Sequence, residues 1–226
     1  MRKHIKIEYD LIKDMRKDII APVDTKGCHL FKDEKLDEDI SNFHVLVGAF
    51  LSSQTQDTIT YDAMQRLKKK NLSIEYILNI PLDELANIIK PVGFHNKKAL
   101  FLKKICNILK DEPFNYKTPT NYNDLIKLPG IGSKMACLIV NVLQKEICGI
   151  CVDTHVHRIS NRLGWVNTKK PEKTKSDLED IIDKKYWNEL NPLLVGFGQK
   201  ICKSFKPKCN ICLLKSRCKY YSDNFK

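Results

Sequence analysis

Apolar side chains recur at helical spacing along most of this chain of 226 residues. The segment Phe43–Ser53 is almost wholly apolar and predicts a buried helix, while residues 96–109 and 133–144 show helical periodicity. Residues 21–41 are polar and predict a connector, and Gly149–Val152 is the one short strand expected. Further helices are expected over residues 8–20, 55–70, 73–79, 122–126, 153–163, 174–183 and 186–197, and from Pro81 onward. The pattern therefore predicts an all-α protein with short connections.

Positive charge dominates the chain. Lys and Arg outnumber Asp and Glu by 39 to 27, which gives a formal net charge of +12. This balance favours a polyanion as partner, most simply nucleic acid, although a lysine-rich solvated surface gives the same count. No apolar run approaches the roughly 18 residues that a membrane span needs, so no membrane partner is expected.

The nine cysteines fall into two groups. Five are scattered, mostly in apolar stretches, and are interpreted as small core residues in a reducing compartment. The other four, Cys202, Cys209, Cys212 and Cys218, lie within 17 residues. A loop that short cannot bury a core of its own, so the cluster predicts a bound metal. Four thiolates suit either zinc or a 4Fe-4S cluster. Zinc sites more often show two close cysteine pairs, whereas this tail has one.

The segment Leu128-Pro-Gly-Ile-Gly-Ser-Lys134 predicts a tight turn between two helices, a helix-hairpin-helix. Gly130 and Gly132 let the backbone take positive φ and approach a ligand closely. Their amides and that of Ser133 then lie at a helix N-terminus, which is a favourable seat for a phosphate. Such a hairpin would grip DNA without reading its sequence. The alternative is an ordinary helical corner in which the glycines only make the bend.

Two charged residues near this hairpin in the sequence are candidates for chemistry. Lys134 follows the hairpin at the positive end of a helix, which disfavours its ammonium form, and nucleophilic attack requires a neutral amine. The alternative is a surface lysine that contacts phosphate. Asp153 precedes a predicted helix and suits an N-cap, but a carboxylate there could also stabilise positive charge developing on a sugar. His155 and His157 are two residues apart and do not make a natural metal pair.

Taken together, and in their order along the chain, three features resemble the endonuclease III family: Leu128–Lys134, Val152–His155 and the four-cysteine tail. Leu51–Asp57 and Val92–Asn96 also look like family segments. The resemblance extends from about residue 41 to residue 218. Two shorter segments, 155–159 and 194–198, are similar to the eukaryotic branch of the family.

The resemblance implies a bifunctional DNA glycosylase of base excision repair, with a helix-hairpin-helix and a 4Fe-4S cluster. Lys134 matches the family nucleophile, which attacks C1′ of the damaged nucleotide and leads to β-elimination. Asp153 matches the catalytic carboxylate. The four tail cysteines match the cluster ligands. The target nucleotide would be flipped out of the duplex, because its C1′ is inaccessible inside the stack.

Residues expected to contact DNA follow from the same resemblance. Gln54 matches the residue that fills the gap left by the flipped nucleotide; helix capping is the alternative. Phe94 falls where bacterial relatives carry a leucine wedge; a core aromatic is the alternative. Ser52, Asp57 and His155 match positions that line or close the pocket.

The resemblance also implies two helical lobes with a DNA cleft between them. A six-helix lobe with the hairpin is expected over residues 36–147, and a cluster lobe over residues 1–35 with 148–226. The expected partner is double-stranded DNA with oxidised pyrimidines or abasic sites, bound by a monomer. The nucleus is the expected location, with the mitochondrion as a second. Rival interpretations are a monofunctional glycosylase of the same superfamily, against which Lys134 argues, and a DNA-binding module without catalysis.

Overall fold

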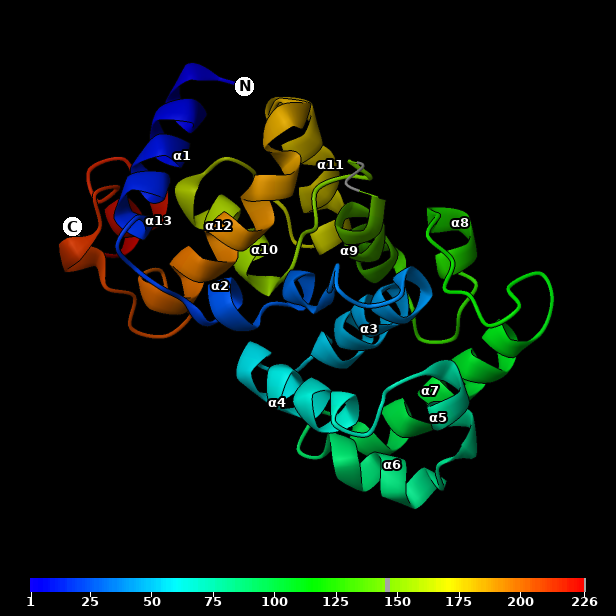
Figure 1. Ribbon diagram of the computed structural model, residues 1–226. Coiled ribbons are helices and arrows are strands. Elements are labelled where there is room, and N and C mark those ends of the chain that lie inside the picture. Colours follow the sequence, from blue (N-terminus) through cyan, green and yellow to red (C-terminus); the bar gives the residue numbers. More distant parts are fainter. Residues whose placement is uncertain (145–146, 226) are drawn as a thin grey trace. The chain divides into compact units, whose positions relative to one another are not determined.

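A computed structural model describes residues 1–144 and 147–225 of the chain (Figure 1). Within those residues every regular element is helical, which confirms the all-α prediction, and no helix there is long and apolar enough to cross a membrane. The chain forms two compact units, Met1–Thr25 with Gly149–Lys226 and Lys26–Cys148. The second unit starts at Lys26, whereas the hairpin lobe was expected to start at 36. Residues 145–146 and 226, which the predicted lobes include, lie outside the described residues.

Helix α3 (Glu38–Ser52) forms the centre of the second unit. Asp37 caps it, because its side chain accepts hydrogen bonds from the backbone of Asp39 and Ile40. The helix is buried all round from Ser41 to Leu51, as its apolar composition predicted. It packs against α4 (Asp57–Lys68), α9 (Ser133–Gln144) and the short 3₁₀ helix η1 (Cys28–Phe31).

The segment before α3 joins this core through one aromatic ring. Phe31 is 1% exposed, and its ring lies so close to Gly48 of α3 that an added Cβ there would come within 2.1 Å of Phe31 Cδ2. The predicted connector at 21–41 therefore contains η1, part of α3 and the short helix α2 (Pro22–Lys26). These helices were not predicted because the segment is polar: α2 and η1 are only about one turn long, and α3 begins after a polar N-cap.

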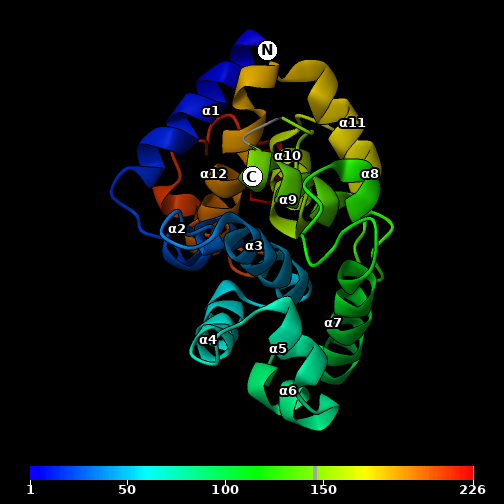
Figure 2. The same cartoon turned by 45° about the vertical axis from the view of Figure 1, so that its right-hand side comes forward.

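The outer part of the second unit is built on α7 (His95–Lys110), against which α5 (Ile74–Asn79) and α6 (Leu82–Ile89) pack (Figure 2). Ser73 caps α5, since its Oγ accepts from Tyr76 N at 3.1 Å. The one-turn helix α8 (Tyr122–Leu125) leads into the hairpin and packs against α9. Helices α3 to α9 thus give seven α-helices in the described part of this unit, where six were expected.

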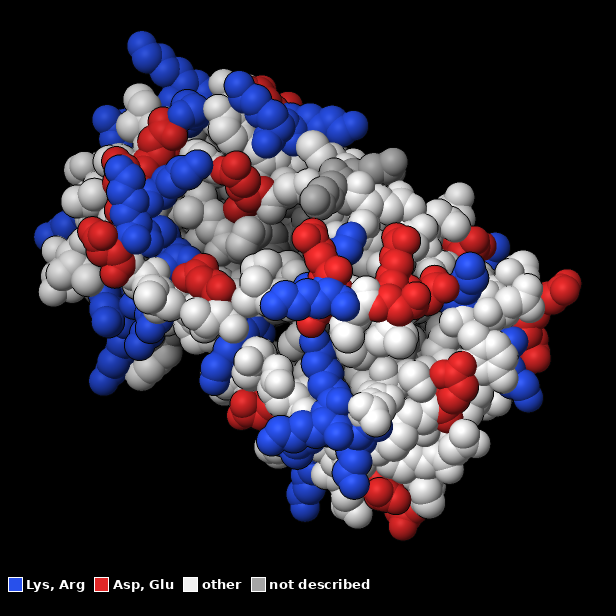
Figure 3. All heavy atoms as spheres, viewed as in Figure 1, with Lys and Arg blue, Asp and Glu red and all other residues white. Residues whose placement is uncertain are grey.

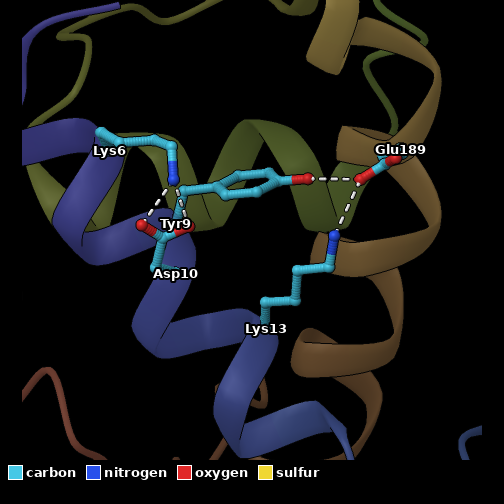
Figure 4. Close-up of polar contacts among 5 residues, drawn as sticks. All are labelled: Lys6, Tyr9, Asp10, Lys13 and Glu189. Carbon is cyan, nitrogen blue, oxygen red and sulfur yellow. Dashed lines mark hydrogen bonds and ion pairs between the residues drawn. The ribbon is translucent and has the colours of Figure 1, made fainter.

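The other unit is built around α12 (Trp187–Lys200), which packs against α1 (Lys3–Arg16) and α10 (Thr154–Leu163). Polar contacts fix α1 to α12: Tyr9 Oη donates to Glu189 Oε2 at 2.8 Å, and Lys13 Nζ lies 3.3 Å from the same oxygen (Figure 4). Burial and the bond to Glu189 raise the pKa of Tyr9 well above its ordinary value. The remaining elements are α11 (Pro171–Ile181), η2 (Lys184–Tyr186), η3 (Cys209–Ile211) and α13 (Lys219–Asn224).

The prediction of a strand at Gly149–Val152 is wrong. The segment is not part of a strand, and helix side chains rather than a neighbouring strand make hydrogen bonds with its backbone. Ile150 N donates to Glu179 Oε1 at 2.9 Å, and Asn191 Nδ2 donates to Cys151 O at 2.7 Å. The apolar residues of this segment are buried. A buried strand and a buried extended segment have the same apolar pattern, so the pattern alone could not distinguish the two.

Candidate functional site

The hairpin between α8 and α9 gives its two glycines different roles. Gly130 has φ 83°, and an added Cβ would lie 2.9 Å from the Phe50 ring, so the fold itself requires glycine there. Gly132 is exposed, does not have positive φ, and an added Cβ would meet no atom within 4 Å. Its surroundings therefore leave the backbone open to close approach by an outside group.

Helix α9 begins immediately after this open position. Its first residues, Ser133 and Lys134, are both exposed, and the first intrahelical bond runs from Ala136 N to Gly132 O at 2.9 Å. The amides of the first turn have no acceptor within the helix and carry partial positive charge. Lys134 thus lies beside a surface that favours an anion.

Two other groups share the electrostatic surroundings of Lys134. Burial raises the pKa of the Cys28 thiol to about 12, with Asp57 adding to the rise and Lys134 opposing it. Asp57 and Lys134 therefore both act on the same partly buried thiol. Asp57 is a candidate from the first turn of α4, and its charge and that of the candidate nucleophile Lys134 each affect Cys28. Cys28 was interpreted from the sequence only as a core residue.

Gln54 and Phe94 occupy two loops that touch. Both residues lie in the left-handed region, with φ 50° and 56°, which is uncommon for residues other than glycine. Gly93 N donates to Thr55 Oγ1 at 3.1 Å, and an added Cβ on Gly93 would lie 2.6 Å from Gln54 O. Glycine at 93 thus lets the two loops meet.

The side chains of these two loops are available to a partner. Phe94 is 65% exposed, which excludes the alternative of a core aromatic. Gln54 is exposed too, and the N-cap of α4 is Gln56, so Gln54 does not cap that helix. Ser52 is half-buried, and its hydroxyl donates to Ala49 O at 2.7 Å within α3. Strained, exposed residues of this kind are typical of functional loops.

Asp153 is the N-cap of α10. Its Oδ1 accepts from Val156 N at 2.8 Å, and the side chain is half-buried. His155 Nδ1 lies 3.1 Å from Arg158 Nη2, and because a guanidinium can only donate, this ring nitrogen is an acceptor. His157 is directed elsewhere and bonds Thr174 of α11 at 2.6 Å. Lys134 and Asp153 belong to different units.

The four tail cysteines line one hollow, partly open to solvent, together with apolar residues that include Phe197 and Leu214. All four are partly buried. Burial raises the pKa of Cys212 to about 11. Nevertheless, across residues 1–144 and 147–225 no three His, Cys, Asp or Glu side chains are grouped tightly enough to hold a single metal ion.

Arg162 connects α10 to this tail, although no motif or spacing in the sequence indicates this contact. Its guanidinium lies 3.5 Å from Cys202 Sγ, donates to Lys203 O at 2.7 Å and to Ser204 O at 3.0 Å, and stacks 4.2 Å from the centre of the Tyr220 ring. The helix that begins at Asp153 is therefore fixed directly to the cysteine tail.

The basic side chains of the tail itself, residues 203–219, all face solvent. On the face drawn in Figure 3, Lys and Arg gather over α1 and α4, with acidic side chains interspersed. Exposed cations on a metal-bound loop suit contact with phosphates. The exposed basic residues of the tail are Lys203, Lys206, Lys208, Lys215, Arg217 and Lys219.

A buried charged residue missed in the sequence is Lys98 of α7, which is only 5% exposed. A signal was present: Lys98 precedes Leu102, Ile105 and Leu109 at intervals of 4, 7 and 11 residues, so it continues the buried stripe of the helix. Its contacts are with the loop that carries Gln54.

Comparisons with known proteins agree with the geometry. Residues 47–184 match the HhH-GPD superfamily of base excision DNA repair proteins. The chain is 44% identical to an endonuclease III homolog of Encephalitozoon cuniculi, over 92% of this chain and 90% of the relative. It is 43% identical to endonuclease III-like protein 1 of Mus musculus, over 92% and 69%.

Two solved structures are similar over nearly their whole length. A trapped covalent intermediate of endonuclease III with DNA aligns with a TM-score of 0.84 at 27% identity, covering 100% of this chain and 99% of that one. A non-covalent endonuclease III–DNA complex aligns with a TM-score of 0.81 at 28% identity, covering 99% and 98%.

Proposed function

Because the chain belongs to the endonuclease III family of base excision repair DNA glycosylases, we propose that it removes oxidised pyrimidines from double-stranded DNA and cleaves the strand at abasic sites. The observation that carries this proposal is the placement of Lys134. It is exposed, it is the second residue of α9, and it directly follows the open backbone at Gly132 and Ser133. A phosphate bound at these amides would bring a nucleotide within reach of the lysine.

Lys134 acts as the nucleophile. Its neutral Nζ attacks C1′ of the nucleotide, the glycosidic bond breaks, and the base leaves with the bonding electrons and takes up a proton. The sugar ring then opens: the C1′–O4′ bond breaks, O4′ takes up a proton, and a Schiff base forms at C1′. This Schiff base makes the 2′ proton acidic. Loss of that proton breaks the bond between C3′ and the phosphate oxygen, which is the β-elimination step. An abasic site enters the same sequence at the Schiff base.

Asp153 stabilises the positive charge that develops on the sugar as the base departs, and it assists proton transfer. The bond from Val156 N fixes one of its oxygens at 2.8 Å and so orients the carboxylate. A carboxylate accepts up to about four hydrogen bonds, so the cap leaves acceptor capacity for this role.

Gln54 and Phe94 contact the DNA from which the nucleotide has been flipped. Unstacking a base costs a few kcal/mol, and side chains that fill the vacated space offset that cost. Both residues are exposed at the tips of touching loops, as such a role requires. Gly130, Gly132 and Ser133 form the hairpin that binds the phosphate backbone, and His155 lines the pocket. A monomer suffices, and a nuclear location agrees with a DNA substrate.

The tail cysteines fit a 4Fe-4S cluster better than zinc. Zinc holds four ligands at about 2.0–2.3 Å from one point, and the described residues show no such group. The four cysteines line one shared hollow together with apolar residues. When bound, a cluster supplies four iron–thiolate bonds that fold the tail, and neither base loss nor β-elimination is a redox step. Cys202, Cys209, Cys212 and Cys218 would hold it.

A gel assay on duplex DNA with one thymine glycol tests the proposal. The wild type should break the strand without added alkali, and Lys134→Ala should not. Base release that needs alkali to reveal it would favour the monofunctional interpretation. Absence of both products from wild-type protein with a full complement of iron would favour a non-catalytic module. Normal turnover by Lys134→Ala would remove the assignment of the nucleophile.

A further inference from the structure

Lys98 is a buried cation whose side-chain hydrogen bonds all go to the last turn of α3 and the loop that follows it. Its Nζ donates to Leu51 O at 2.8 Å, to Ser53 O at 2.5 Å and to Thr55 Oγ1 at 3.2 Å. An ammonium has three hydrogens, so its donor capacity is used on neutral oxygens of α3 and the α3–α4 loop. Burial lowers the pKa of Lys98 to about 8. Enclosing this charge is therefore costly, and an apolar residue on the same stripe would avoid the cost.

These three acceptors surround Gln54. The carbonyl of Ser53 belongs to the peptide unit that precedes Gln54, so its direction helps to set the φ of that residue. A residue other than glycine is strained in the left-handed region. A charge-assisted hydrogen bond on that carbonyl is stronger than a neutral one and offsets this strain. Lys98 thus holds Gln54 in a conformation that it would otherwise leave.

Lys98 also connects this loop to Phe94. Its backbone N–H donates to Phe94 O at 2.9 Å, at the first turn of α7. Thr55 Oγ1, which accepts from Lys98 Nζ, accepts from Gly93 N as well and donates to Ser53 O at 3.1 Å. One lysine and one threonine hydroxyl therefore join the two loops whose tips are Gln54 and Phe94.

We propose that Lys98 is a positioning residue that holds Gln54 and Phe94 together in the arrangement needed to enter DNA at a flipped nucleotide. This inference rests on the proposed glycosylase function. It assigns a reason for a buried charge in α7 and makes the two insertion residues one preorganised unit. Lys98 itself does not touch DNA.

The same helix supplies a matched control. Lys103 Nζ donates to Leu78 O at 2.9 Å and to Ile80 O, so it clamps the loop between α5 and α6 in the same chemical manner. That loop carries none of the candidate DNA-binding residues. Removing Lys103 therefore removes a comparable set of bonds without touching the insertion loops.

The test compares Lys98→Met and Lys103→Met with the wild type. Each protein is titrated with two fluorescent duplexes, one undamaged and one with a tetrahydrofuran abasic analogue, and the ratio of the two affinities is measured. We expect Lys98→Met to lower this ratio at least tenfold, while its affinity for undamaged DNA changes less than about twofold, because phosphate contacts at the hairpin and the tail persist. Lys103→Met should keep the wild-type ratio even if its unfolding temperature falls.

A third variant guards against a failure of Lys98→Met to fold. Thr55→Val keeps the shape of the side chain and removes the hydroxyl that joins the loops, so it should lower the same ratio by a smaller factor. An unchanged ratio in folded Lys98→Met, or an equal fall in Lys103→Met, would overturn the inference. If Lys98→Met does not fold, an unchanged ratio in Thr55→Val would do so. Strand cleavage by the wild type is measured in parallel, so loss of the proposed function itself would be recognised separately.

Discussion

The two roles of Asp153 can be separated by two substitutions. As the N-cap of α10, its carboxylate accepts one hydrogen bond, from Val156 N at 2.8 Å. Asp153→Ala removes that acceptor, and loss of a cap costs about 1 kcal/mol. For a protein of this size, about 1 kcal/mol lowers the unfolding temperature by roughly 2–4 °C. Asp153→Asn keeps an equally good cap and loses only the favourable charge at the helix N-terminus, worth about 0.3–1 kcal/mol.

The loss of activity should not parallel the loss of stability, which is larger for Asp153→Ala than for Asp153→Asn. Both variants lack the negative charge that would stabilise the developing positive charge on the sugar, so both should lose strand cleavage on thymine-glycol DNA by roughly 100-fold or more. Thermal unfolding and single-turnover cleavage are measured on the same samples. The asparagine variant should be nearly as stable as the wild type and nearly inactive.

Asp37→Ala provides the control for capping. Asp37 caps α3 by accepting from Asp39 N at 2.9 Å and Ile40 N at 3.3 Å, and it is not a candidate for catalysis. This variant should lose a comparable amount of stability, about 1 kcal/mol, and keep its activity. Full activity of Asp153→Asn would refute the reasoning and leave Asp153 as a structural cap alone.

Three further outcomes follow from the structure. Gly132→Ala should change the free energy of unfolding by no more than about 0.5 kcal/mol, because an added Cβ meets nothing in the chain. The variant should nevertheless bind duplex DNA more weakly in a titration. Binding equal to that of the wild type would contradict a close phosphate contact at this backbone. Cys212→Ser should lose bound iron by elemental analysis, and stoichiometric zinc in the wild type would contradict the cluster. Since burial lowers the pKa of Lys98 to about 8, the unfolded chain binds more protons there between about pH 8 and about pH 10.4. The stability of the wild type relative to Lys98→Met should therefore rise over that range, by up to about 3 kcal/mol, in urea unfolding at stepped pH; a flat difference would contradict the burial of the charge.

Much of the fold could be predicted from local signals. The apolar composition of α3 predicted its burial, and Ser73 and Asp153 were recognisable as caps because side-chain chemistry and helix onset coincide. Boundaries were less accurate: α1 begins at Lys3, five residues before its predicted start, because its first turn is polar. The extended segment at Gly149–Val152 resembled a strand because burial alone makes both apolar.

The site was predictable only where a motif carries it. Lys134 and Asp153 lie in recognisable segments, whereas the contacts of Lys98 depend on where a loop 45 residues away in the sequence comes to lie. The same holds for Cys28, whose pKa is affected by the charges of Asp57 and Lys134 from two other segments of the second unit. Contacts between residues so far apart in the sequence depend on tertiary packing, so they could not be predicted from sequence spacing. The exposure of Phe94 likewise became known only from the fold.

The most direct test of the central claim is to identify the residue that becomes joined to DNA. The wild type is incubated with an abasic duplex and borohydride, the adduct is digested, and the modified peptide is sequenced by mass spectrometry. The account predicts a stable adduct with the sugar attached to Lys134 Nζ. An adduct on another lysine, or no adduct from protein that binds the duplex, would contradict it.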